Sequence, residues 1–79
     1  MLAEVLVFIV VEPGKLDSVG RALRKVAGVR EVLSVTGEYD IIVRIEARDV
    51  ESALRIVKDS ILPIDGIRKT ITSIVVERY

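Results

Sequence analysis

The sequence predicts an α+β fold of the ferredoxin-like type, in which two helices cover one face of a four-stranded antiparallel sheet. Three observations lead to this prediction. The chain has 79 residues, which is enough for one domain. Hydrophobic residues make up 51% of it, which is ample for a folded core. The hydrophobic periodicity changes in the order strand, helix, strand, strand, helix, strand, which is the split βαβ (βαββαβ) pattern.

The first three elements follow from local patterns. Residues 2–11 are apolar at almost every position, so we expect this strand to be covered on both faces. Apolar residues at helical spacing predict a helix over 15–27, and Gly28 is a suitable stop for it. Residues 29–36 read as the second strand, and a short connection at Gly37 leads into the third.

The second half of the chain repeats this alternation. Residues 39–47 form the clearest strand, and its period of two places four side chains on one face: Tyr39, Ile41, Val43 and Ile45. A second helix is predicted over 49–60, with Asp49 as its N-cap. The breakers within 62–66 predict a loop, and residues 67–77, rich in Ile, Val and Thr, predict the last strand.

The small size of the chain and its apolar sheet favour self-association. A core of this length rarely supplies more than about 3–5 kcal/mol. The chain has no Cys and no His, so disulfides and the commonest metal ligands are missing. Ile42 adds an apolar side chain to the sheet face that the helices leave open. We therefore expect a dimer formed by face-to-face packing of two sheets, against the alternative of a monomer that exposes a few aliphatic groups.

Composition and charge argue against several functions. The 12 basic and 12 acidic residues balance, so the basic surface of a nucleic-acid-binding protein is not expected. No signal peptide and no membrane-spanning run are predicted, and the lack of Cys fits the cytoplasm. Without His, Cys or a phosphate-binding loop we expect no cofactor and no enzyme. The absence of Asn and Gln indicates a thermophilic source.

Two polar clusters are candidate binding residues. In the turn before the third strand, Gly37 permits a positive φ and the close approach of a ligand, and Asp40, beside Tyr39, can accept hydrogen bonds from an ammonium group. Thr70 and Thr72 share one face of the last strand, where their hydroxyls can bind a zwitterion. Each cluster also has a purely structural interpretation: a turn glycine, a capping aspartate, a tyrosine at the edge of the core, and threonines suited to a half-exposed strand.

Taken together, these residues resemble the effector-binding domain of the Lrp/AsnC (feast/famine) transcription regulators, called the RAM domain. The resemblance rests on three segments: Thr36 to Asp40, Gly66 to Val75 with its Thr-x-Thr-Ser run, and Pro13 to Leu16 at the start of the first helix. It extends from Leu2 to Glu77, and the combination of segments is more specific than any one of them.

The resemblance implies an assembly and a ligand. RAM domains dimerise through their sheets, and the dimers assemble into octamers or similar rings, with an amino acid bound between dimers. On this pattern the turn holds the main-chain groups of the amino acid, and the last strand of a neighbouring subunit lines the same pocket. The implied binding residues are Gly37, Tyr39, Asp40, Thr70, Thr72 and Ser73.

The chain departs from the family in one respect. Typical members carry an N-terminal helix-turn-helix domain, whereas here Met1 leads straight into the first strand. We therefore expect a single stand-alone domain over 1–79 that does not bind DNA itself and acts by joining full-length regulators. Three alternatives stay open: an ACT-like regulatory subunit, whose ligand would lie near 12–14, a ligand-free assembly module, and an enzyme that uses Tyr39 or Asp40.

Overall fold

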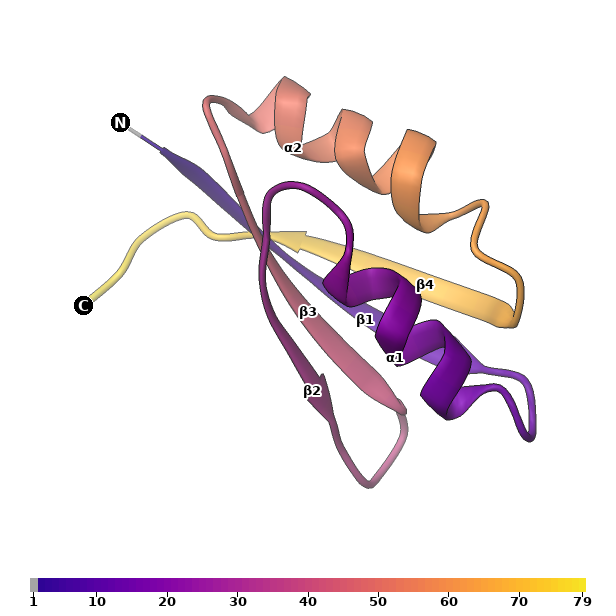
Figure 1. Ribbon diagram of the computed structural model, residues 1–79. Helices are drawn as coiled ribbons and strands as arrows, with labels where there is room; N and C mark the ends of the chain where they lie inside the picture. Colours follow the sequence, from indigo (N-terminus) through magenta and orange to yellow (C-terminus); the bar gives the residue numbers. More distant parts are fainter. Residues whose placement is uncertain (1) are drawn as a thin grey trace.

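The computed structural model describes residues 2–79 and has the predicted order of elements (Figure 1). Met1, with which the predicted domain begins, lies outside the described residues. One antiparallel sheet has the strand order β2-β3-β1-β4, with the bounds β1 (Ala3–Val11), β2 (Val29–Ser34), β3 (Ile41–Ala47) and β4 (Ile67–Ile74). The helices are α1 (Leu16–Arg24) and α2 (Val50–Ile56), and α2 continues into a π-helical turn, η1 (Val57–Ile61).

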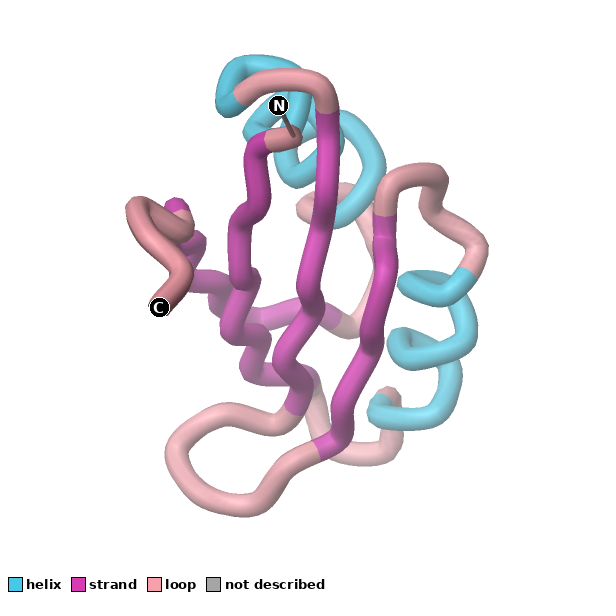
Figure 2. Tube along the Cα trace, turned by 90° about the vertical axis from the view of Figure 1, so that its left-hand side faces the viewer, coloured by secondary structure: helices cyan, strands magenta, loops and turns pink. Residues whose placement is uncertain are grey.

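Both helices lie on the same side of the sheet (Figure 2), so the predicted ferredoxin-like α+β fold is confirmed. The central strands β1 and β3 supply the sheet side of the core, because alternate residues of a strand point to the same face. Val5, Val7 and Ile9 of β1 lie opposite Ile45, Val43 and Ile41 of β3. These six side chains are buried with others from the helices: Val19, Leu23, Ala53, Val57 and Ile61.

The ends of the helices follow from local chemistry. Asp49 caps α2 as predicted, because its Oδ1 accepts a hydrogen bond of 2.7 Å from the backbone N–H of Ser52. The first helix ends at Arg24, three residues before the predicted end. Gly28 follows in the turn into β2, where a Cβ would lie 2.8 Å from Cδ1 of Ile56. Glycine at this position therefore allows the loop to pack under the second helix.

The other face of the sheet carries an apolar row that crosses all four strands. Its members are opposite one another in the strand register: Leu33, Ile42, Phe8 and Ile71. We call them the open-face row. Leu33 is 48% exposed and Ile71 41% exposed, although both are large and apolar. Burying apolar surface is worth about 25 cal/mol per Å², so the open-face row favours contact with a partner.

Candidate functional site

The turn between β2 and β3 contains three of the predicted site residues. A hydrogen bond of 2.9 Å from the backbone N–H of Val35 to the carbonyl oxygen of Asp40 closes it. Gly37 lies at its exposed tip with a φ of 112°, a conformation that glycine adopts without the strain other residues would suffer. A Cβ at Gly37 would meet no atom within 4 Å. The backbone of this tip is therefore open to an approaching ligand.

Asp40 attaches the turn to β1. Its Oδ2 accepts a hydrogen bond of 2.9 Å from the backbone N–H of Val11, and its own N–H donates to the carbonyl oxygen of Ile9, also at 2.9 Å. Asp40 therefore has a structural role, but it bonds a strand 29 residues away and is not the local cap that its structural interpretation expected. Within residues 2–79 no other hydrogen bond reaches this carboxylate, so Oδ1 can still accept one from an external donor.

Tyr39 lies on the face opposite to the one predicted. The alternation of β3 placed it with Ile41 on the helix-facing side, and this prediction was wrong because β3 begins only at Ile41. The preceding turn breaks the alternation. The half-buried Tyr39 ring packs against Phe8, with ring centroids 5.5 Å apart and planes inclined by 53°. Tyr39 therefore extends the open-face row toward the turn.

The β4 candidates lie on two faces of the sheet. Thr70 and Thr72 share one face of β4, as predicted; they are opposite Ile9 and Val7 of β1, so this is the helix-facing side. Ser73 is opposite Leu6 and points to the open face. Because Ile9 is opposite both Ile41 and Thr70, the turn and Thr70 lie at the same end of the sheet. Two strand spacings, roughly 10 Å, separate them, so one chain does not bring the six residues into a single pocket.

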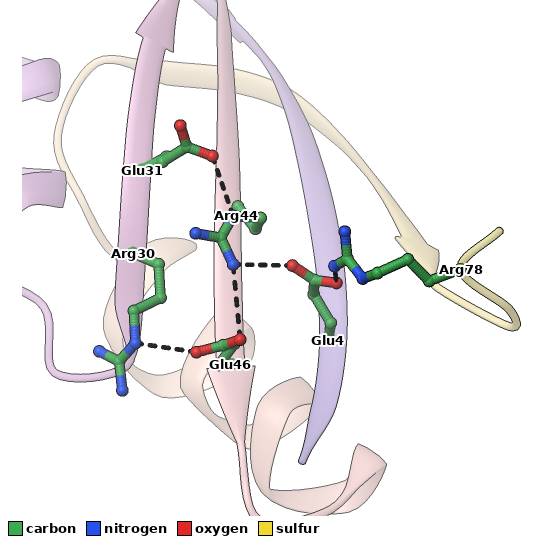
Figure 3. A network of polar contacts seen from close by, with 6 residues as sticks. All are labelled: Glu4, Arg30, Glu31, Arg44, Glu46 and Arg78. Carbon is green, nitrogen blue, oxygen red and sulfur yellow. Dashed lines mark hydrogen bonds and ion pairs between the residues drawn. The ribbon is translucent and has the colours of Figure 1, made fainter.

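Six charged side chains form a network on the open face that the sequence analysis did not identify (Figure 3): Glu4, Arg30, Glu31, Arg44, Glu46 and Arg78. Arg44 lies at its centre and donates to Glu31 from Nε at 2.9 Å and to Glu4 from Nη1 at 2.8 Å. Arg78, from the segment after β4, donates to the other oxygen of Glu4. A hollow of about 170 Å³ lies beside this network.

The strand register explains why these charges form a network. Glu4 and Glu46 are directly opposite one another, an arrangement that is unfavourable for like charges. Nη1 of Arg44 contacts both, at 2.8 Å and 3.5 Å. The hydrogen bond from Arg44 lowers the pKa of Glu4 below its usual value, Arg78 adds to this effect, and burial of the carboxylate opposes it. Glu4 and Glu31 in turn raise the pKa of Arg44.

Two further features of the described chain bear on its chemistry. Residues 2–79 contain no group of three or more His, Cys, Asp or Glu side chains that could hold a metal ion. In the same part of the chain, no helix combines the length and the apolar character that crossing a membrane requires.

The fold defines a small α+β domain with a ferredoxin-like sheet. Residues 4–79 match the family model described as the Lrp/AsnC ligand binding domain. Because this match covers nearly the whole chain, the chain belongs to the Lrp/AsnC ligand-binding domain family. The resemblance seen in the sequence is confirmed.

Three known proteins are similar to this chain in sequence or in fold. The homocitrate synthase of Sulfolobus acidocaldarius is 38% identical over 61 residues, which are 77% of this chain and 13% of the enzyme. The protein TTHA0845 of Thermus thermophilus superposes with a TM-score of 0.92 and 30% identity, over 98% of this chain and 96% of its own. A transcriptional regulator of Neisseria meningitidis, NMB0573, solved as a complex with L-Met, has a TM-score of 0.83. The two sequences are 18% identical, and the match covers 95% of this chain and 50% of the regulator's chain, so the likeness shows a shared fold.

Proposed function

We propose that this domain is an amino-acid sensor that acts by binding in an oligomer and not by catalysis. The turn from Gly37 to Asp40 carries the proposal. It combines an unobstructed backbone tip with a carboxylate that keeps one oxygen available. Backbone N–H groups at the tip suit the carboxylate of an amino acid, and Oδ1 of Asp40 suits its ammonium group.

Membership of a ligand-binding domain family supports this proposal. So does the Neisseria meningitidis regulator of the same fold, which was solved with L-Met. The ligand proposed for the present chain is accordingly a free amino acid held by its main-chain groups. Thr70 and Thr72 of β4 complete the pocket from a neighbouring subunit, whereas Ser73, on the other face of that strand, lies on the open face. This arrangement accounts for the separation of the two threonines from the turn within one chain.

The proposal includes assembly through the sheet. The open-face row and Tyr39 present apolar surface next to a network of three acidic and three basic residues. A second copy in face-to-face contact covers the row. Dimers then meet at the turns and form a ring, for which an octamer is the arrangement we propose.

The proposed role is regulatory and cytoplasmic. In this role the domain joins full-length Lrp/AsnC regulators and changes their assembly without contacting DNA itself. A second candidate is a regulatory subunit or domain that serves an enzyme. The 38% identity with part of a homocitrate synthase favours it. Both candidates require the same amino-acid site.

A thermal-shift screen of the twenty amino acids tests the site. A ligand that binds only the folded protein at a hundredfold excess over its Kd stabilises it by about 2.7 kcal/mol. We expect an increase in Tm for one or a few amino acids, and its loss in Asp40→Asn. Asparagine is the matched replacement, because it keeps an oxygen for the N–H of Val11 and removes the charge. No increase with any amino acid favours a ligand-free assembly module instead.

A further inference from the structure

A groove between α1 and β2 lies on the helix-facing side of the sheet, away from the open face and beside the end of β2 that leads into the turn. Its volume is about 300 Å³, at the lower end of the range for small-molecule sites. The groove lies where the first helix runs beside the edge strand (Figure 2). Its apolar lining comes from Leu16, Val32 and Ile41. A volume within the small-molecule range suits a ligand of the size of a free amino acid.

The polar rim of the groove carries charges of both signs. Asp17, Arg21 and Arg24 line it from α1, and Ser34 lines it from β2. No residue in the described range 2–79 forms an ion pair within 4.0 Å with any of the three charged groups, whereas Glu4, Arg44 and Asp49 all have partners. Side chains three and four positions apart on a helix are neighbours, about 5–6 Å apart at Cβ. The carboxylate and the two guanidiniums therefore form one contiguous rim.

Gly20 gives an independent indication that something approaches α1 here. It lies in the middle of the helix and lines the groove. Glycine costs a helix roughly 0.8–1.0 kcal/mol relative to alanine. A Cβ at Gly20 would meet nothing within 4 Å, so packing inside this chain does not require glycine. Close approach of a ligand to the helix backbone is one role for which glycine is selected.

The geometry points to a second ligand site in this groove, for a free aliphatic α-amino acid. Arg21 and Arg24 receive its carboxylate, Asp17 receives its ammonium group, and its hydrocarbon side chain lies along Leu16 and Val32 next to Gly20. The site lies within one chain, so it does not require the assembly that completes the pocket at the turn. It goes beyond the proposed function and does not depend on it.

Titration of the ¹⁵N-labelled protein with isoleucine, followed by amide chemical shifts, tests this site. We expect the amides of Gly20, Arg21 and Val32, which line the groove, to move. 3-Methyl-2-oxopentanoate has the same carbon skeleton without the ammonium group, so it should bind more weakly, and Asp17→Asn should reduce that difference. Arg21→Gln should weaken binding about tenfold or more, as expected for loss of a charge-assisted hydrogen bond. Lys25→Gln, just beyond the end of the same helix and outside the groove, is the matched control and should bind normally.

Gly20→Ala separates a ligand role from a folding role. We expect this variant to raise the Tm of the unliganded protein and to weaken the isoleucine-induced shifts in the groove. The proposal would be overturned if the amides of the groove did not shift at any isoleucine concentration up to its solubility limit. It would also be overturned if Arg21→Gln and Lys25→Gln bound isoleucine with equal affinity. Shifts of Gly37 and Asp40 report the turn separately, so failure of one site is distinguishable from failure of the other.

Discussion

The carboxylate of Asp40 accepts a hydrogen bond of 2.9 Å from the backbone N–H of Val11, across a separation of 29 residues. This contact joins the turn before β3 to the end of β1 through a side chain rather than through the strand ladder. The contact fixes the position of the Asp40 carboxylate where the turn meets β3, and it leaves Oδ1 of that carboxylate available. Stability and the proposed ligand binding therefore involve the same side chain, and different substitutions are needed to separate the two roles.

Asp40→Ala should destabilise the fold by about 1–3 kcal/mol, because the part-buried N–H of Val11 loses its acceptor. Asp40→Asn should cost clearly less, since its amide oxygen can accept the same hydrogen bond. Urea denaturation of both variants gives the two free energies of unfolding. Equal losses in the two variants would contradict a structural role for the hydrogen bond.

Gly37→Ala should destabilise the protein by about 1 kcal/mol, because its φ of 112° is unfavourable for alanine although space is available. Gly66→Ala is the comparison, since Gly66 has a similar φ of 103°. A Cβ there would also lie 2.8 Å from Cβ of Lys15 and 3.0 Å from Cγ2 of Val19. We expect the loss at Gly66 to exceed the loss at Gly37 in urea denaturation. A larger loss of stability at Gly37 than at Gly66 would contradict the open space around the tip of the turn.

The network around Glu4 should make stability depend on acid pH. The hydrogen bonds from Arg44 and Arg78 lower the pKa of Glu4 in the folded protein below the ordinary value of 4.5. A lowered carboxyl pKa contributes stability that is fully present above the unfolded-state value and is lost as pH falls through the folded-state value. The Tm of the wild type should therefore fall more steeply below about pH 4.5 than the Tm of Glu4→Gln. Parallel curves would show that the network contributes no pH-dependent stability.

Leu33→Arg should weaken self-association, because it places a charge in the open-face row of both copies. Leu33 is already 48% exposed, so the substitution should leave the monomer folded. Leu54→Arg, at a leucine of α2 that is 39% exposed, is the matched control on the helical side. Sedimentation velocity should show dissociation for the first variant and not for the second. Dissociation by Leu54→Arg alone would place the interface on the helices.

Local patterns were sufficient to predict most of the fold. Apolar residues on both faces of the first strand predicted a central position, and β1 lies between β3 and β4 with one side against the helices. Cover of its other side, which carries Phe8, stays a prediction. Asp49 could be recognised as an N-cap because capping depends on the next three residues alone. Tyr39 was placed on the wrong face because the alternation of a strand does not extend through a turn.

The charged network and the groove could not be predicted, because both depend on which residues the fold brings together. Arg44 and Glu46 alternate along one strand, but only the strand register puts Glu4 and Glu31 beside them. The groove next to Gly20 likewise results from how α1 packs against β2, which no residue spacing discloses. At the turn, residue types alone were sufficient to single out Gly37 and Asp40 as candidate binding residues. Their separation from the β4 hydroxyls depends on the order and register of the strands, which the sequence does not disclose.

Isothermal titration calorimetry with the amino acid that gives the largest thermal shift tests the central claim most directly. We expect saturable binding to the wild type and binding weakened about tenfold or more in Asp40→Asn, because the ammonium group loses a charged partner. Tyr39→Phe, which removes a neighbouring hydroxyl and keeps the ring packed on Phe8, provides a folded comparison. Equal affinity in wild type and Asp40→Asn would contradict the site at the turn, and absence of binding heat for every amino acid would contradict the sensor itself.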